Sequence, residues 1–135
     1  MIVADANLLA ALVIESPNTS VAEDVMRVSR QWYVPLLWRS ETANILIGYV
    51  RRKSISLDGA QRRWERLSQI LADGERAPDF GRVLSLAAES GCTAYDCEYV
   101  AIAEVLSMPL VTFDREVLRT FPRIAVSPPT FLSRV

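Results

Sequence analysis

Histidine is absent from all 135 positions of the chain. Without an imidazole the chain cannot use a Ser-His-Asp triad, a Cys-His pair, a histidine-ligated zinc site or a paired-histidine ribonuclease mechanism. The only lysine, Lys53, lies in a predicted helix. That position fits poorly with a phosphoacceptor receiver domain, which needs a lysine near the end of a strand. The chemistry that remains available depends on oxygen ligands.

Cysteine is scarce as well, and long apolar runs are missing. Cys92 and Cys97 match neither a Cys-x-x-Cys redox motif nor a zinc knuckle, so we expect two buried free thiols in a reducing compartment. No apolar stretch approaches the roughly 20 residues that a bilayer span needs. The N-terminus lacks a basic leader and carries Asp5 inside its apolar part. We therefore expect a cytoplasmic protein with no membrane segment.

The overall composition is that of one ordinary domain. Half of the residues are apolar (50%), and the length predicts a single domain over residues 1–135 with one sizeable core. The net charge of −1 gives no long-range attraction to nucleic acid. The basic residues are nevertheless clustered, and 14 of the 15 are arginine, in groups at 51–53, 62–66 and 115–123.

Short β patterns alternate with longer helical ones along the chain. Strands are predicted at Met1–Asp5, Trp32–Val34, Leu110–Phe113 and, weakly, Ile124–Val126. Helices are predicted at Ala6–Ile14, from a Ser20 cap to Arg30, from Glu41 behind a Ser40 cap to Lys53, then at Leu57–Asp73, Asp79–Glu89, from Thr93 to before Pro109, and at Arg115–Phe121. An irregular tail is predicted from Ser127. This alternation predicts an α/β fold with a mostly parallel sheet covered on both faces.

Four carboxylates, Asp5, Glu41, Asp96 and Asp114, interrupt or border apolar segments. Each has an ordinary explanation, because acidic residues are favoured as helix caps and in first turns. In a parallel sheet, however, Asp5 and Asp114 would face one crevice, since both end strands. A carboxylate against an apolar wall is costly unless it is compensated, and a divalent cation compensates it while supplying hydrolytic chemistry. The four together indicate metal-dependent hydrolysis.

The same residues lie in segments with a recognisable order. A hydrophobic strand leads to Asp5, one further residue and Asn7; Ser40 precedes Glu41 in a helix; Asp96 lies in the segment 93–103; and 109–114 ends in Thr-x-Asp. In this order the chain resembles the PIN-domain nucleases, and among them the VapC-type toxins of type II toxin–antitoxin pairs. The resemblance covers nearly the whole chain and departs at Ala6, where the family often has threonine.

The resemblance implies a PIN-like three-layer α/β/α sandwich with a central, mostly parallel sheet. It also implies a Mg²⁺- or Mn²⁺-dependent endoribonuclease, a homodimer, and a small antitoxin protein that blocks the site. The residues that match the family's site fall into two groups: Asp5, Glu41, Asp96 and Asp114 as catalytic residues and metal ligands, and Asn7 and Thr112 in support. We expect Asp5 and Asp96 to hold the principal ion, while Glu41 and Asp114 orient its waters or complete a second site. A metal-activated water would then hydrolyse the RNA phosphodiester bond.

An RNA substrate needs cations around such an acidic site. The candidates for substrate binding are Arg51, Arg52 and Arg115. The three tryptophans, Trp32, Trp38 and Trp64, could stack on bases, although packing in a core or a dimer interface is their more common use. A second interpretation stays open: a catalytically inactive PIN-like module that only binds RNA or protein.

Overall fold

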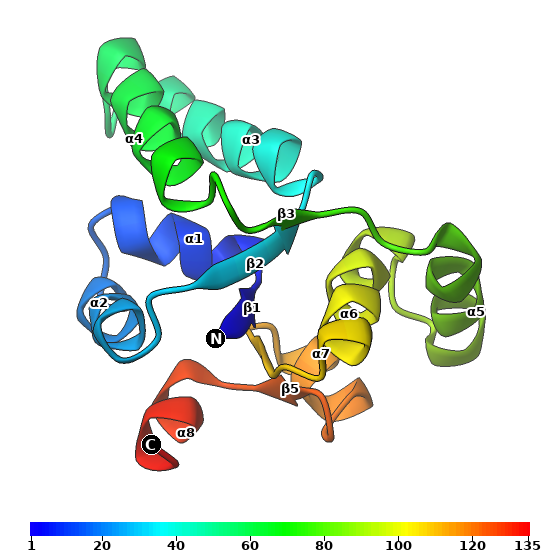
Figure 1. Ribbon diagram of the computed structural model, residues 1–135. Helices are drawn as coiled ribbons and strands as arrows, with labels where there is room; N and C mark the ends of the chain where they lie inside the picture. The colour runs from blue at the N-terminus through cyan, green and yellow to red at the C-terminus, as the bar shows by residue number, and fades with distance from the viewer.

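A parallel sheet of five short strands forms the centre of the molecule (Figure 1). The computed structural model describes all residues from Met1 to Val135. The strand order is β3-β2-β1-β4-β5, and every neighbouring pair is parallel. The strands are β1 (Ile2–Ala4), β2 (Trp32–Pro35), β3 (Glu75–Arg76), β4 (Leu110–Val111) and β5 (Ala125–Val126).

Helices cover both faces of this sheet, so the predicted α/β sandwich is confirmed. They are α1 (Ala6–Val13), α2 (Thr19–Val28), α3 (Trp38–Arg51), α4 (Leu57–Ile70), α5 (Phe80–Ser90), α6 (Ala94–Leu106), α7 (Arg115–Thr120) and α8 (Pro128–Ser133). Side chains of β1 alternate between the two faces. Ile2 and Ala4 pack with α1 to α4, while Val3 packs with α5, α6 and α7. Figure 1 shows these two helical groups on opposite sides of β1.

Two predicted helix caps are wrong. The second helix, α2, begins at Thr19 rather than after Ser20, because the Thr19 hydroxyl bridges the preceding turn: it accepts from the Ser16 backbone N–H at 3.0 Å and donates to the Ile14 carbonyl at 2.9 Å. The third helix, α3, begins at Trp38, so Ser40 lies inside its first turn and does not cap it.

A contact with β3 explains the early start of α3. The carboxylate of Glu75 accepts hydrogen bonds from the Trp38 indole at 2.8 Å and from the Arg39 guanidinium at 2.7 Å, once on each oxygen. The Trp38 ring also stacks on that of Trp64 in α4, with centroids 5.3 Å apart. Trp32 and Trp38 are buried, so at these positions tryptophan packs the core and is not available to stack on bases.

Two short elements were missed by the sequence pattern. The edge strand β3 has no apolar residue, and it is placed by the chain before it: a Cβ on Gly74 would lie 2.0 Å from the Trp32 carbonyl oxygen of β2. The predicted irregular tail is instead helix α8. Its Ser127 cap accepts from the Thr130 N–H at 3.3 Å, and the prolines that follow are tolerated because first-turn N–H groups need no helical partner.

The prediction of two buried free thiols is confirmed. Cys92 and Cys97 are free and buried. No helix has both the length and the apolar character needed to cross a bilayer.

Candidate active site

The carboxyl ends of β1 and β4 define the site. These two strands are neighbours, although the chain visits β2 and β3 on one side before crossing to β4 on the other. Parallel sheets bind ligands at such a reversal of strand order, outside the carboxyl ends of the strands. Asp5 follows β1 directly, and its backbone N–H donates to the Val111 carbonyl at the end of β4 over 3.1 Å. Thr112 is therefore adjacent to Asp5.

Asp5 is the most enclosed acidic residue of this edge, at 7% exposure. Its Oδ1 caps α1 by accepting from the Ala6 N–H at 2.8 Å, and its Oδ2 accepts from the Thr112 hydroxyl at 2.7 Å. Burial raises the pKa of Asp5 to about 6, the two hydrogen bonds oppose that rise, and the charges of Asp96 and Asp114 add to it. Asp5 therefore caps a helix, which is the ordinary explanation for an aspartate at this position. Unlike most caps it is almost completely buried, and the charges of other acids act on it.

The Thr112 hydroxyl connects the two strand ends. It donates to Asp5, and it accepts from the Asn7 side-chain amide at 3.1 Å and from the Asp114 backbone N–H at 3.0 Å. A hydroxyl has one proton and two lone pairs, so all of its hydrogen-bonding capacity is used. Asn7 also accepts from the Phe113 N–H at 3.1 Å. Asn7 and Thr112 thus hold the two strand ends together beside Asp5, and their supporting role in catalysis stays a prediction.

Asp114 caps α7. Its Oδ1 accepts from the backbone N–H groups of Glu116 at 2.9 Å and Val117 at 3.1 Å, whereas its Oδ2 has no protein donor. Helix capping therefore accounts for the Oδ1 oxygen of Asp114 and not for its Oδ2 oxygen. The other oxygen is left without a protein partner.

Glu41 lies in the first turn of α3 and is half-buried. The Tyr99 hydroxyl of α6 donates to its Oε1 at 2.6 Å, and its Oε2 has no protein donor. Burial raises the pKa of Glu41 to about 7, the Tyr99 hydrogen bond works against the rise, and the charges of Asp5, Asp96 and Glu98 add to it. Glu41 is therefore not an ordinary solvated first-turn glutamate.

Tyr99 is a site residue that the sequence interpretation did not single out. It is 1% exposed and lies three residues after Asp96, so the two side chains share a face of α6. From its spacing on the helix, Tyr99 is expected only to pack in the core. Only the contact of its hydroxyl with Glu41 shows that it also belongs to the site.

Asp96 is in the first turn of α6, where its N–H donates to the Thr93 hydroxyl at 3.0 Å. Burial raises its pKa, Thr93 lowers it, and the charges of Asp114 and Glu116 raise it further. The charge of Asp96 thus raises the pKa values of Asp5 and Glu41, and the charge of Asp114 raises that of Asp96. The four predicted carboxylates share one electrostatic neighbourhood.

None of these four acids is neutralised by a basic side chain. The salt bridges of the protein use other acids, namely Asp24, Glu75, Glu104 and Glu116. No three acidic or cysteine side chains are arranged so that they alone could hold a metal ion. Mg²⁺ keeps several waters and needs only one or two carboxylates, so an uncompensated acidic group with donor-free oxygens on Glu41 and Asp114 fits such a hydrated ion. A cage of four direct ligands remains a prediction.

The three predicted substrate-binding arginines lie at different distances from this group. All are exposed. Arg115 starts α7, directly after Asp114. Arg51 and Arg52 are at the opposite end of α3 from Glu41, about 15 Å away at 1.5 Å per residue. The Arg52 guanidinium also lies over the Tyr49 ring, 4.5 Å from its centroid.

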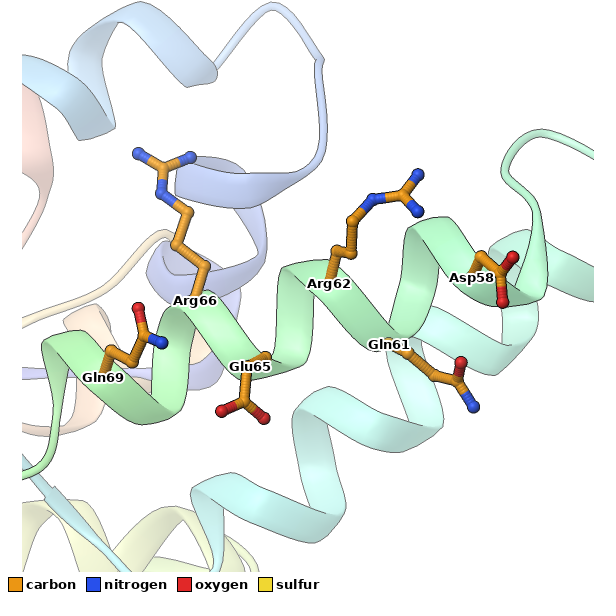
Figure 2. A pocket seen from close by; sticks show the side chains of 6 residues that line it. All are labelled: Asp58, Gln61, Arg62, Glu65, Arg66 and Gln69. Carbon is orange, nitrogen blue, oxygen red and sulfur yellow. The ribbon is translucent and has the colours of Figure 1, made fainter.

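A further set of polar residues lies along α4, away from the carboxylates. A shallow hollow of about 430 Å³ is lined there by Asp58, Gln61, Arg62, Glu65, Arg66 and Gln69. Figure 2 shows that all six project from successive turns of this one helix and that no other element lines the hollow. On the same helix, Arg63 donates to the Val13 carbonyl at 2.9 Å, at the end of α1 remote from Asp5. We therefore describe this hollow as an open helix face.

Comparison with known proteins identifies the family of the chain. The family model described as PIN domain matches residues 2–125. Ribonuclease VapC3 of Pyrobaculum aerophilum is 30% identical over 127 residues, covering 91% of this chain and 96% of the relative. The crystal structure of PAE2754 from Pyrobaculum aerophilum superposes with a TM-score of 0.76 at 26% identity, covering 98% of this chain and 86% of the other.

A chain from a toxin–antitoxin complex of Klebsiella pneumoniae superposes with a TM-score of 0.67 at 17% identity, covering 95% of this chain and 98% of that one, which supports the fold alone. The family match and the relative from Pyrobaculum both span nearly the whole chain. The chain therefore belongs to the PIN domain family, in its VapC-type branch.

Proposed function

We propose that this protein is a toxin that acts as an endoribonuclease and hydrolyses RNA phosphodiester bonds with Mg²⁺ or Mn²⁺. The observation that carries the proposal is the buried carboxylate of Asp5, whose pKa is raised by burial and by the charges of Asp96 and Asp114, and which itself raises the pKa of Glu41. No salt bridge neutralises any of these four acids. The similarity to a protein named as a ribonuclease supports RNA as the substrate.

Asp5 and Asp96 would hold the cation, which when bound neutralises phosphate charge and lowers the pKa of a nearby water. The Asp5 carboxylate is suited to this role because Ala6 and Thr112 fix both of its oxygens. Glu41 Oε2 and Asp114 Oδ2 have no protein donor, so they are free to accept hydrogen bonds from waters. In this arrangement the protein orients the waters through rigidly held carboxylates.

Proton transfer also needs a group, and the chain has no histidine. A general base works best when its pKa is near the working pH. Glu41 offers such a group: in the metal-free protein burial raises its pKa to about 7, and its Oε2 has no protein donor. Glu41 Oε2 would therefore accept a proton from the attacking water, in the role that an imidazole has in other nucleases.

The RNA would be held by residues beside the acids. Arg115 follows Asp114 and is exposed, so it can pair with a phosphate next to the cleaved bond. Tyr95 directly precedes Asp96 and is 62% exposed, which makes its ring available to stack on a base. Arg51 and Arg52 are too far along α3 to contact the same phosphate, and would contact flanking nucleotides only.

The proposal extends to protein partners and location. A homodimer and a small antitoxin that covers the acidic edge are expected, and with RNA as the substrate we expect the activity in the cytoplasm. The VapC-type family is the ground for expecting an antitoxin, and the fold is shared with a chain from a toxin–antitoxin complex. Light scattering would measure the mass in solution, and an antitoxin added in equal amount should abolish RNA cleavage.

Cleavage of single-stranded RNA tests the enzymatic proposal directly. The parent should cut RNA in Mn²⁺ and not in EDTA, and Asp5→Asn or Asp96→Asn should remove the activity. Asp58→Asn is the matched control, since it removes an exposed carboxylate on α4 outside the acidic group. Sequencing the new RNA ends after brief expression would identify the cleavage site. If the parent binds RNA without cutting it, the non-catalytic binding module is the better description. If the two site variants cut RNA as well as the parent, Asp5 and Asp96 are not the residues that carry the activity.

A further inference from the structure

We propose that Tyr99 is a positioning residue that sets the orientation of Glu41 toward the other carboxylates. The proposal rests on the proposed nuclease function, since it assigns a partner to one of its acids. It is carried by a hydrogen bond of 2.6 Å between the Tyr99 hydroxyl and Glu41 Oε1, which joins residues 58 positions apart in the chain.

The bond is a polar contact between two helices that pack mainly against other elements. Helix α3 packs chiefly against α1 and α4, whereas α6 packs chiefly against α5, β1 and β2. No other hydrogen bond or salt bridge joins α3 to α6. The direction of the Glu41 side chain relative to Asp96, on α6, therefore depends on this single polar contact.

Tyrosine is well suited to hold a flexible glutamate. Glu41 has several rotatable bonds and is half-buried, so alone it could turn toward water. The Tyr99 ring is fixed in the core by its neighbours on α6 and is 1% exposed. Burial and the neighbouring acids raise the pKa of Tyr99, so its hydroxyl stays protonated and acts as a donor.

The bond also determines which glutamate oxygen remains free. Because Oε1 accepts from Tyr99, Oε2 is the oxygen without a protein donor. The charges of Asp5 and Asp96 both act on the Glu41 carboxylate that Tyr99 holds. Tyr99 is thus a hydrogen-bond donor to a carboxylate of the candidate metal site. Loss of such a donor typically weakens metal affinity about 10- to 100-fold.

Tyr99→Phe tests the role, because it removes only the hydroxyl and keeps the buried ring. Mn²⁺ binding should weaken by about 10-fold or more, measured from the free Mn²⁺ signal by electron paramagnetic resonance, with an unchanged near-ultraviolet circular dichroism spectrum. Tyr33→Phe is the matched control. Its hydroxyl has only the Met1 sulfur as a partner, at 3.7 Å, so Mn²⁺ binding should equal that of the parent.

A double-mutant cycle separates positioning from a general structural role. If Tyr99 acts through Glu41, adding Tyr99→Phe to Glu41→Gln should cause no further loss of Mn²⁺ affinity. Effects that simply add, a Tyr99→Phe affinity within twofold of the parent, or loss of the folded spectrum would each overturn the proposal. These outcomes differ from failure of the nuclease function itself, in which the parent neither binds Mn²⁺ nor cleaves RNA.

Discussion

The burial of Asp5 predicts that the metal-free protein loses stability as the pH rises. Its pKa is 3.8 in an unperturbed carboxyl and about 6 in the fold. Between these values the native state holds a proton that the unfolded state has released, so the free energy of unfolding falls with pH. The contribution is fully present below about pH 4 and is lost as the pH passes through about 6. Glu41 adds a change in the same direction that extends to about pH 7.

The size of the effect follows from the shift. About two pKa units correspond to about 3 kcal/mol over the whole window. Since only about one unit of that window lies above pH 5, Asp5 should account for about 1.4 kcal/mol between pH 5 and pH 8. For a domain of this length that is a fall in Tm of about 5 °C. The contribution of Glu41 is smaller than its shift suggests, because solvent screens a half-exposed carboxylate.

Urea unfolding in EDTA at pH 5, 6, 7 and 8 measures the slope. Asp5→Asn should flatten it, while Asp58→Asn, an exposed acid on α4, should leave it as in the parent. Saturating Mn²⁺ should reverse the slope, because a cation binds the deprotonated acids, and at 100 times its Kd it adds about 2.7 kcal/mol. The reasoning is refuted if stability in EDTA is flat or rises from pH 5 to pH 8, or if Asp5→Asn keeps the slope of the parent.

Three further predictions concern the strand ends and the substrate. Thr112→Val should lower the free energy of unfolding by about 1–3 kcal/mol in urea titrations, because three hydrogen-bonding groups lose a buried partner. Thr112→Ser keeps the hydroxyl and should keep most of the stability. Equal stabilities of the parent and the valine variant would contradict this prediction. Arg115→Ala should weaken RNA binding and reduce the salt slope by about 1 in fluorescence anisotropy titrations with a site-inactive variant, and a slope equal to that of the parent would argue against the phosphate contact. Tyr95→Ala should lower RNA affinity by about 5-fold or more in the same titrations while Mn²⁺ binding stays unchanged, whereas loss of both would indicate a disturbed α6 rather than a lost stacking contact.

The layout of the sheet and most of the helices were predictable from local pattern. The run before Asp5 is apolar at every position and forms β1, and the helix behind it ends within one residue of the predicted Ile14. Such elements are specified by side-chain periodicity over a few turns or a few strand residues. The two-residue strand β3 carries no such periodicity. It exists because Glu75 and the close approach of Gly74 hold that segment against β2 and the start of α3.

The candidate site divides in the same way. Asp5 and Asp114 could be assigned to one edge because each follows a strand, and parallel strands end on the same side of a sheet. Their function as helix caps was equally visible, and the structure confirms it. What the pattern did not indicate is that Asp5 combines capping with burial, next to the charges of Asp96 and Asp114 and without a basic partner.

By itself the sequence determined the α/β class, the order of the acidic residues and the family, since each depends on residue types at fixed spacings along the chain. Only the tertiary structure decided which oxygens are free and which are held. Thr112 meets Asp5 across 107 residues, and Tyr99 meets Glu41 across 58. The physical reason is that a hydrogen bond acts over about 3 Å. Its partners are therefore set by how the strands and helices pack, and not by the local propensities that formed them.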